Sequence, residues 1–242
     1  MPHKQHRTVV RPALTAEQHS LGEVSAMREI RVWFSKTGSA RFISHLDLMR
    51  CMTRAARRAH LPLWYTQGFN SRVYMTFALP LSLGVSGLRE SMDLRLEQDM
   101  PVEEITKRMN KVLPPDIRVL DVTEPKMRPG EIEFASYQIF LPSKKPQSLS
   151  QGIQELLQRQ PLLVDKKSKH GVLQMDLHPE LNRTQVSATP EGVCIHAVLP
   201  AGCNFNLNPH LLVNCIETYL KITLNAQIVR TDLYNAGMQP FI

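Results

Sequence analysis

One helix can be located in the sequence together with both of its ends. Ser44 and Asp47 have the spacing of a capping box, in which the Ser44 hydroxyl accepts a hydrogen bond from the Asp47 amide. At the other end, Pro62 lacks a backbone N–H and disfavours the α conformation at Leu61. We therefore expect a helix over residues 44–60, and the rest of the chain has to fold around it.

The two faces of this helix differ in chemistry. Apolar residues recur at the spacing of one helical face, at Leu48, Met52, Ala55 and Ala59. Arginines occupy another face, at Arg50, Arg54, Arg57 and Arg58. The helix can therefore bury one side and present four guanidinium groups on the other.

Positive charge is concentrated around this helix. The chain has a net charge of +7, and residues 41–72 contain six arginines and one acid, which gives +5 within 32 residues. A solvated helix face is one interpretation. Guanidinium groups, however, form paired hydrogen bonds with phosphate or carboxylate, which favours a polyanionic partner. RNA is preferred to a membrane surface, because no amphipathic stretch suited to a membrane is evident.

The segment after the helix reads as a loop with aromatic residues. Tyr65-Thr-Gln-Gly-Phe-Asn70 contains Gly68, which permits a turn, and Tyr65 and Phe69 could stack on bases. Trp33, Phe34 and Tyr74 could stack on bases as well, but most of the aromatic residues are expected in the core, and Tyr65 and Phe69 are the better candidates. The candidate RNA-binding or anion-binding residues are Arg41, Arg50, Arg54, Arg57, Arg58, Tyr65, Gly68, Phe69, Asn70 and Arg72.

The remaining pattern predicts an α+β fold made of two similar units. Strands are expected at 29–35, 73–79, 90–97 and 117–122, with a second helix at 101–112. This order of elements is the split βαβ plan of ferredoxin-like domains. A related order follows, with strands at 135–141, 162–164, 173–177, 184–188, 193–199 and 226–231 and helices at 148–158 and 209–220.

We therefore expect tandem ferredoxin-like units, the second elaborated by an extra hairpin. Residues 1–27 are polar and lack a sustained period, which predicts a flexible arm. The first unit, with the basic helix, would cover 28–124 and the second 132–242. The proline- and glycine-bearing residues 125–131 would link them.

Several kinds of chemistry lack a sequence signature. The chain has no phosphate-binding loop, no H-E-x-x-H or G-x-S-x-G motif, and no cysteine spacing for an iron–sulfur cluster. Its four scattered cysteines suit reduced thiols in a reducing compartment. Without a secretory or membrane-spanning stretch, a cytoplasmic location is expected. We expect neither a structural metal nor a cofactor.

Two titratable residues have a functional and a structural interpretation. His45 lies in the first turn of the basic helix, where the helix dipole disfavours imidazolium and would keep an acid–base-capable neutral ring. It is the candidate catalytic residue, and a packed or exposed structural histidine is the alternative. Asp93 is either a functional carboxylate or an ordinary exposed residue of an alternating strand.

Five motifs together resemble the radical SAM-linked protein family. They are Phe42-Ile-Ser-His-Leu-Asp-Leu-Met-Arg50, Arg54-Ala-Ala-Arg-Arg58, Leu61-Pro62, Tyr65-Thr-Gln-Gly-Phe-Asn70 and Phe77-Ala-Leu-Pro-Leu-Ser-Leu-Gly84. A weaker similarity extends to Leu199-Pro-Ala-Gly202 and Asn206-Leu-Asn-Pro209. The resemblance implies a domain of unknown function encoded beside, or fused to, a radical SAM protein. The family pattern usually continues with Pro-His-Pro after Asn70, where this chain has Ser71-Arg72-Val73, so no role of that histidine can be transferred.

Three functions fit these observations. The leading hypothesis is an accessory module, without independent catalysis, that binds RNA through residues 44–60 and 65–72 and presents it to a radical SAM partner. The second is a protein-docking domain for that partner that binds no nucleic acid. The third is a metal-independent RNA-processing enzyme that uses His45 with Arg41 or Arg54.

Overall fold

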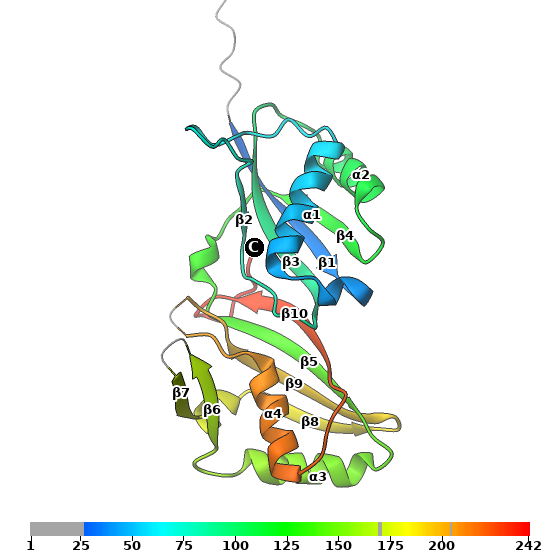
Figure 1. The fold of residues 1–242 in the computed structure, drawn as a ribbon, viewed down its shortest axis with the longest axis vertical. Helices are drawn as coiled ribbons and strands as arrows, with labels where there is room; N and C mark the ends of the chain where they lie inside the picture. Colours follow the sequence, from blue (N-terminus) through cyan, green and yellow to red (C-terminus); the bar gives the residue numbers. More distant parts are fainter. Residues whose placement is uncertain (1–26, 169–170, 204) are drawn as a thin grey trace, which may run out of the picture.

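The computed structural model describes residues 27–168, 171–203 and 205–242 (Figure 1). The predicted flexible arm, residues 1–27, lies outside them except for its last residue. The strands are β1 (Arg28–Lys36), β2 (Met75–Phe77), β3 (Val85–Leu96), β4 (Ile117–Thr123), β5 (Phe134–Pro142), β6 (Leu163–Ser168), β7 (Gly171–Asp176), β8 (Thr184–Thr189), β9 (Gly192–Pro200) and β10 (Gln227–Tyr234). The helices are α1 (His45–Arg58), α2 (Val102–Val112), α3 (Pro146–Leu157) and α4 (Pro209–Leu220), with short 3₁₀ helices η1 (Gly38–Phe42), η2 (Pro129–Glu131) and η3 (His178–Leu181). None of the helices in the described ranges has the length and apolar character needed to cross a lipid bilayer.

The fold is a mixed α+β arrangement built on one large, mostly antiparallel sheet, which confirms the predicted α+β class. The strand order is β4-β1-β3-β10-β5-β9-β8, and β2 pairs with β3 beside this path. β6 and β7 form a separate two-stranded sheet. The pairing of β10 with β3 is parallel, whereas the other described pairs are antiparallel.

β3 joins two groups of strands that have the same internal order. The first half contributes β4, β1, β3 and β2, and the second half contributes β10, β5, β9 and β8. Near its end β3 pairs with β2, through Met92–Leu94, and at its start it pairs with β10, through Val85–Gly87. Figure 1 shows the two halves stacked along the long axis, with β3 and β10 meeting in the middle. One continuous sheet therefore runs through both halves.

Each half buries its own apolar core against its helices. In the first half, Met52 of α1 and Ile105 of α2 are fully buried in a cluster that includes Phe34 of β1. In the second half, Ile153 of α3 and Ile216 of α4 are buried together with strand residues such as Ile139, Val193 and Ile195. Trp33 is also buried but belongs to the second cluster. The expectation that Trp33 and Phe34 are core residues is confirmed.

The joint between β3 and β10 contains a buried ion pair. Arg230 of β10 lies beside Gly87 of β3, and its Nε and Nη2 donate to the Glu90 carboxylate at 2.9 and 2.5 Å. The same guanidinium donates to the carbonyls of Leu79 and Pro80 at 2.9 and 3.2 Å. A Cβ on residue 87 would lie 2.3 Å from Glu90 Oε1, so glycine makes room for the carboxylate. Arg230 thus fixes both the joint and the loop that follows β2.

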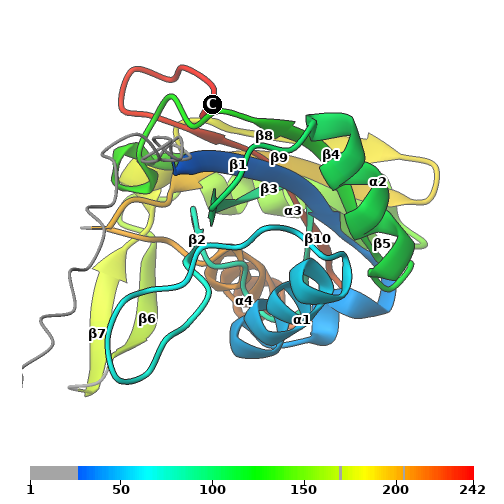
Figure 2. The same cartoon turned by 90° about the horizontal axis from the view of Figure 1, so that it is seen from above.

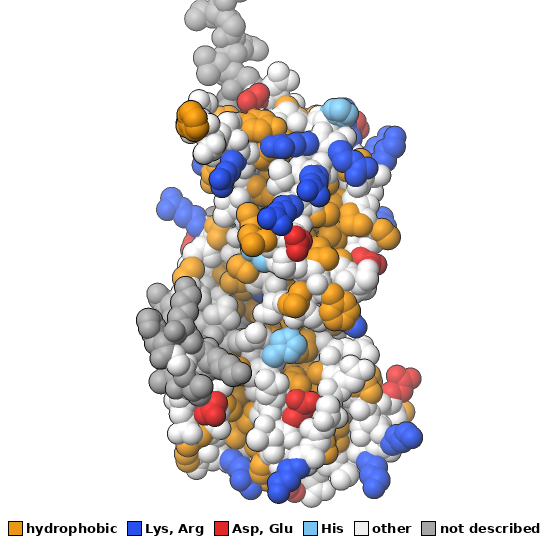
Figure 3. All heavy atoms as spheres, in the orientation of Figure 1, with side chains coloured by type: hydrophobic (Ala, Val, Ile, Leu, Met, Phe, Trp, Pro, Cys, Tyr) orange, Lys and Arg blue, Asp and Glu red, His pale blue; other side chains and the backbone are white. Residues whose placement is uncertain are grey.

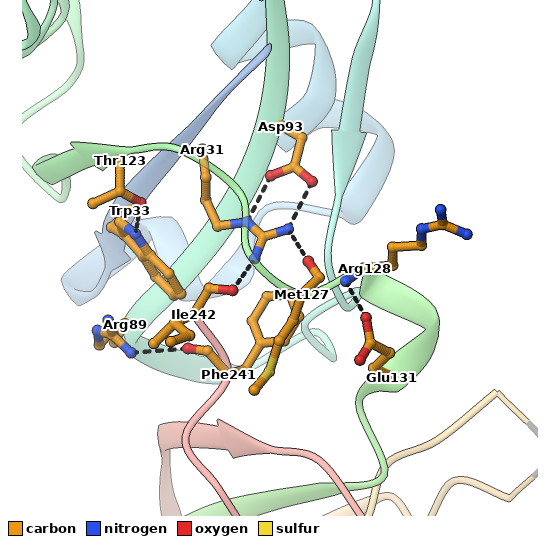
Figure 4. A network of polar contacts seen from close by, with 10 residues as sticks. All are labelled: Arg31, Trp33, Arg89, Asp93, Thr123, Met127, Arg128, Glu131, Phe241 and Ile242. Atoms are coloured by element: carbon orange, nitrogen blue, oxygen red, sulfur yellow. Dashed lines mark hydrogen bonds and ion pairs between the residues drawn. The ribbon is translucent and has the colours of Figure 1, made fainter.

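A second buried ion pair lies where the C-terminal residues cross the sheet (Figure 4). Arg31 of β1 donates to both oxygens of Asp93 on β3, at 2.7 and 2.8 Å. It also donates to the carbonyls of Met127 and Ile242, at 2.8 and 2.9 Å. Figure 2 shows the C-terminal residues on the side of the sheet opposite α1 and α4. This pair therefore holds the segment after β4 and the last described residues against the sheet.

The structure corrects four expectations from the sequence. Asp93 is 5% exposed, so the exposed interpretation was wrong; strand alternation cannot reveal the arginine on the neighbouring strand. The strand expected at 73–79 is shorter, because β2 covers only Met75–Phe77. The residues that follow leave the strand, and the carbonyls of Leu79 and Pro80 accept hydrogen bonds from Arg230. The strand expected at 162–164 is longer, because β6 covers Leu163–Ser168, and the strand expected at 173–177 begins earlier, at Gly171 of β7.

Replacing Arg230 with methionine should lower the free energy of unfolding by about 3–5 kcal/mol, because the variant leaves the buried Glu90 without its ion-pair partner. Urea denaturation measures the change. Arg108→Met is a matched control: Arg108 pairs with Glu104 in a bridge whose side chains are 39% and 40% exposed. The control should cost less than about 1 kcal/mol. Equal losses in the two variants would contradict the structural role of Arg230.

Candidate nucleic-acid interface

α1 has the predicted cap and the predicted buried face. Ser44 Oγ accepts a hydrogen bond from the Asp47 amide at 3.1 Å and donates to the Asp47 carboxylate at 2.7 Å. The predicted apolar positions, Leu48, Met52, Ala55 and Ala59, are between 0% and 4% exposed. The helix ends slightly earlier than expected, at Arg58, because His60 adopts a left-handed backbone with φ of 51°. One side of α1 is therefore fixed on the core.

The other side of α1 carries the arginines. Arg50, Arg54, Arg57 and Arg58 are all exposed. Figure 3 shows Lys and Arg side chains spread over the upper part of this face, with few acidic side chains among them. Arg50 is 3.2 Å from Asp47 in an exposed pair, which contributes little. Among the residues that the structure describes, Arg54, Arg57 and Arg58 form no ion pair.

Three of these arginines line one groove. It has a volume of about 360 Å³ and is lined by Arg50, Arg54 and Arg58, with Val112 and Pro114 at the end of α2. Asp47 and Cys51 also border it, and burial raises the pKa of the Cys51 thiol, which favours the neutral form. The groove therefore presents guanidinium groups beside an apolar wall. The sequence pattern gave no sign of Val112 and Pro114, because only tertiary packing brings α2 beside α1.

The loop after α1 is closed by hydrogen bonds at its base. Thr66 N donates to the Arg72 carbonyl at 2.8 Å, and Arg72 N donates to Thr66 Oγ1 at 3.1 Å. At its tip, Gly68 has φ of 125° with open space around it, and Phe69 is 104% exposed. Asn70 and Arg72 are exposed as well. The loop thus presents a fully accessible aromatic ring and an exposed arginine.

Tyr65 connects this loop to the arginine face. The Arg57 guanidinium lies 5.6 Å from the centre of the Tyr65 ring. Tyr65 is half-buried against the first core cluster, and its backbone forms an isolated bridge with Val73. The structure therefore brings Arg57 and Tyr65 together. Arg41 is separate from both: it lies in η1, before the start of α1, with its guanidinium 4.7 Å from the centre of the Phe42 ring.

The ring of His45 is partly enclosed, and one of its two nitrogens is buried. Its ring packs edge-on against Phe77 at 5.2 Å between centroids, and its Nδ1 is buried without a hydrogen-bond partner. Burial lowers the pKa of His45 below its usual value, and the positive charge of Lys36 lowers it further. The direction agrees with the expected neutral ring, but the main cause is desolvation. Lys36, fully buried beneath η1, had no signal in the sequence.

A second aromatic group consists of Tyr74, which the sequence analysis considered, and Trp64, which it did not. The Arg95 guanidinium lies 4.0 Å from the centre of the Tyr74 ring and 5.7 Å from that of Trp64. Tyr74 and Arg95 border a hollow of about 550 Å³ that residues 125–129 also line. Arg95 pairs with Glu29 at 3.5 Å, so its charge is partly compensated, unlike that of Arg54, Arg57 and Arg58 on α1.

The residues that the structure describes were also compared with the requirements of a metal site. They contain no group of three or more His, Cys, Asp or Glu side chains placed to hold a metal ion. Cys51, Cys194, Cys203 and Cys215 are free thiols. The chemistry that this surface offers is therefore cationic and aromatic.

The lowered pKa of His45 predicts a pH dependence of stability. The folded state holds fewer protons on His45 than the unfolded state, in which the pKa is near 6.5. Stability should therefore be unaffected above that pH and fall as the pH decreases towards the folded pKa. His45→Asn should lose less stability than the unsubstituted chain between about pH 7 and about pH 5. Urea denaturation at both pH values, with NMR titration of the His45 ring, measures this. Equal losses, or a His45 pKa at or above 6.5, would contradict it.

Comparisons with known proteins identify a family. No curated protein matches the chain. Among solved structures, the chain matches one titled "Crystal Structure of an Unknown Protein from Galdieria sulphuraria", with 9% sequence identity over 84% of this chain and 98% of that chain. The TM-score of that match is 0.25, which is too low to establish a shared fold. A family model matches residues 29–209, which span α1, the arginine groove and the loop at 65–72. The chain therefore belongs to the family described as "Uncharacterized protein conserved in bacteria (DUF2344)".

Proposed function

We propose that this chain is an RNA-binding accessory module of a radical SAM protein. RNA would bind along the exposed face of α1 and the loop at 65–72. The observation that carries this proposal is the set of unpaired guanidinium groups, Arg54, Arg57 and Arg58, on one face of a rigidly held helix. Exposed arginines without acidic neighbours leave their hydrogen-bond donors available to phosphate oxygens.

The aromatic residues favour a single strand over other polyanions. Phe69 is fully exposed at the tip of the loop, and Tyr65 lies beside Arg57. A single strand can splay its bases onto such rings while its phosphates meet the arginines, whereas bases in a duplex are already stacked. Gly68, with open space around it, would let a backbone approach closely. Arg41, Arg50, Asn70 and Arg72 would contribute further polar contacts.

The proposal also includes a tandem ferredoxin-like fold and a radical SAM partner. Each half, 28–124 and 132–242, would be a ferredoxin-like unit, with 125–131 linking them and the β6–β7 hairpin elaborating the second. The identical internal strand order of the two halves supports this inference. The association with a radical SAM protein rests on the sequence resemblance and implies a cytoplasmic module that delivers RNA to the partner.

The experiment also has to distinguish RNA binding from two alternatives, a protein-docking domain and an RNA-processing enzyme. A docking domain would use the same cations to meet an acidic surface of the partner and would bind no RNA. An RNA-processing enzyme would need His45 as its acid–base group. The enclosed ring and orphaned Nδ1 of His45 make that role less favourable.

RNA affinity should fall steeply as salt concentration rises. If five of the six candidate arginines each neutralise one phosphate of a single strand, the logarithm of the association constant should fall with the logarithm of the salt concentration with a slope of about −3.5. The double variant Arg54→Glu/Arg57→Glu should bind at least about tenfold more weakly and reduce that slope by about 1.4. Fluorescence anisotropy with a labelled single-stranded RNA measures both quantities.

A matched control changes the same amount of charge elsewhere. Lys144 and Lys145 are exposed and lie before α3 in the second half. Lys144→Glu/Lys145→Glu should retain the RNA affinity to within about twofold after the long-range charge effect is screened by salt. Equal losses in the two double variants would show that only net charge matters. A salt-independent affinity, or capture of the radical SAM partner without RNA, would refute the RNA proposal and favour docking.

A further inference from the structure

The hollow beside residues 125–129, called here the linker hollow, opens on the face of the sheet opposite α1. Leu94 and Leu96 of β3 are fully buried in the first core cluster, so Arg95 between them points to the opposite face. Glu29 lies directly across from Arg95 on β1 and therefore points the same way. Both side chains line the hollow, which has a volume of about 550 Å³ and is closed on its other side by residues 125–129.

The guanidinium of Arg95 is held as a planar surface in this hollow. It lies 4.0 Å from the centre of the Tyr74 ring and 5.7 Å from that of Trp64. The two rings pack edge-on against each other, with 6.0 Å between their centroids. The Arg95 side chain is still 32% exposed, so part of the guanidinium remains accessible. A guanidinium plane fixed in this way is a surface on which proteins stack the bases of single-stranded RNA.

Glu29 places hydrogen-bond acceptors beside this surface. One of its carboxylate oxygens lies 3.5 Å from Arg95, and the other forms no hydrogen bond among the residues that the structure describes. The Glu29 side chain is 40% exposed, and a carboxylate only accepts hydrogen bonds. Guanine presents two donors side by side, N1–H and the N2 amino group, whereas adenine, cytosine and uracil each present one donor group on that edge. The linker hollow therefore matches guanine better than the other bases.

We infer that the linker hollow binds a guanine base of the RNA strand, stacked on Arg95 and hydrogen-bonded to Glu29. This inference rests on the proposed RNA binding and adds a base preference to it. The volume of the hollow lies within the range of pockets that enclose small molecules, which leaves room for the ribose beside the base.

The loop at 65–72 connects the linker hollow to the arginine face of α1. Tyr65 packs against the first core cluster, on the side where the α1 arginines lie. Trp64 precedes it and accepts a backbone hydrogen bond from Tyr74 at 3.2 Å, and the side chains of these two residues lie on the side of Arg95. A strand that passes over the loop therefore reaches both sides, with the exposed ring of Phe69 at the edge between them.

Two cations of the linker are available to the phosphates that flank the base. Lys126 and Arg128 line the hollow, are exposed, and form no ion pair within the part of the chain that the structure describes. Figure 4 shows the Arg128 side chain extending away from the pair of Arg31 and Asp93. Glu131 is the one acid of residues 125–131, so these two cations leave the segment with a net charge of +1. Phosphate contacts of this kind position a strand without selecting its sequence.

Fluorescence anisotropy with two labelled single-stranded RNAs tests the inference. Both are uridine strands, one with a central guanosine and one with a central adenosine. Because both purines stack, the difference between them reports on hydrogen bonding. The unsubstituted chain should bind the guanosine strand about tenfold more tightly, the discrimination expected of one good bidentate pair. Glu29→Gln should reduce this preference to less than about twofold, because the amide replaces one acceptor with a donor.

A matched control removes the same charge from another part of the first half. Glu103 is exposed in the first turn of α2, and Glu103→Gln should keep the guanosine preference. Arg54→Glu/Arg57→Glu should weaken the binding of both strands alike and keep their ratio, because those arginines contact phosphates. Thermal melts verify that each variant is folded.

Equal binding of the two strands to the unsubstituted chain, or a guanosine preference that Glu29→Gln retains, would overturn the inference and leave the proposed RNA binding intact. If neither strand binds, the proposed function fails, and titration with guanosine 5′-monophosphate tests the linker hollow by itself. Binding that Glu29→Gln weakens at least about tenfold would support the guanine site independently of RNA. No binding, or binding that Glu29→Gln leaves unchanged, would overturn it.

Discussion

The parallel pairing of β10 with the first residues of β3 determines how the rest of the molecule is arranged. Only three residue pairs form this joint, Ile228 with Val85, Val229 with Ser86 and Arg230 with Gly87. Such a short contact between two separate cores gains its rigidity from the buried pair of Arg230 and Glu90, which breaks at a cost of several kcal/mol. The arrangement requires glycine at position 87, because the carboxylate occupies the space of a side chain there. Arg31 and Asp93 hold the segment after β4 and the last described residues on the sheet in a similar way.

This joint also explains how the candidate sites arise. The second half buries one side of the loop after β2, through the Leu79 and Pro80 carbonyls, and thereby fixes Gly84 against η1 and α4. The first half presents α1 on a core that leaves its arginine face exposed. The arginine groove thus depends on packing within the first half, where α2 lies beside α1.

Local features could be predicted from the sequence, and features formed by distant residues could not. The Ser44 cap and the apolar stripe of α1 depend on residues a few positions apart, so their patterns are visible in the chain. The exposed positions of Arg50, Arg54, Arg57 and Arg58 follow from the same helical period. The burial of Asp93 and Lys36 depends on partners from other strands and segments, and the groove wall at Val112 depends on how α2 packs. Periodicity carries no information about such contacts.

The central claim is that RNA lies on α1 and the loop that follows it. Ultraviolet crosslinking of the purified chain to a single-stranded RNA, followed by mass spectrometry of the crosslinked peptides, tests it most directly, because aromatic residues that stack on bases crosslink at their own positions. The account predicts crosslinks at Phe69 and Tyr65, on the face that carries Arg54 and Arg57. Crosslinks confined to Tyr74 and Trp64, or their absence in a preparation that still captures the radical SAM partner, would contradict it.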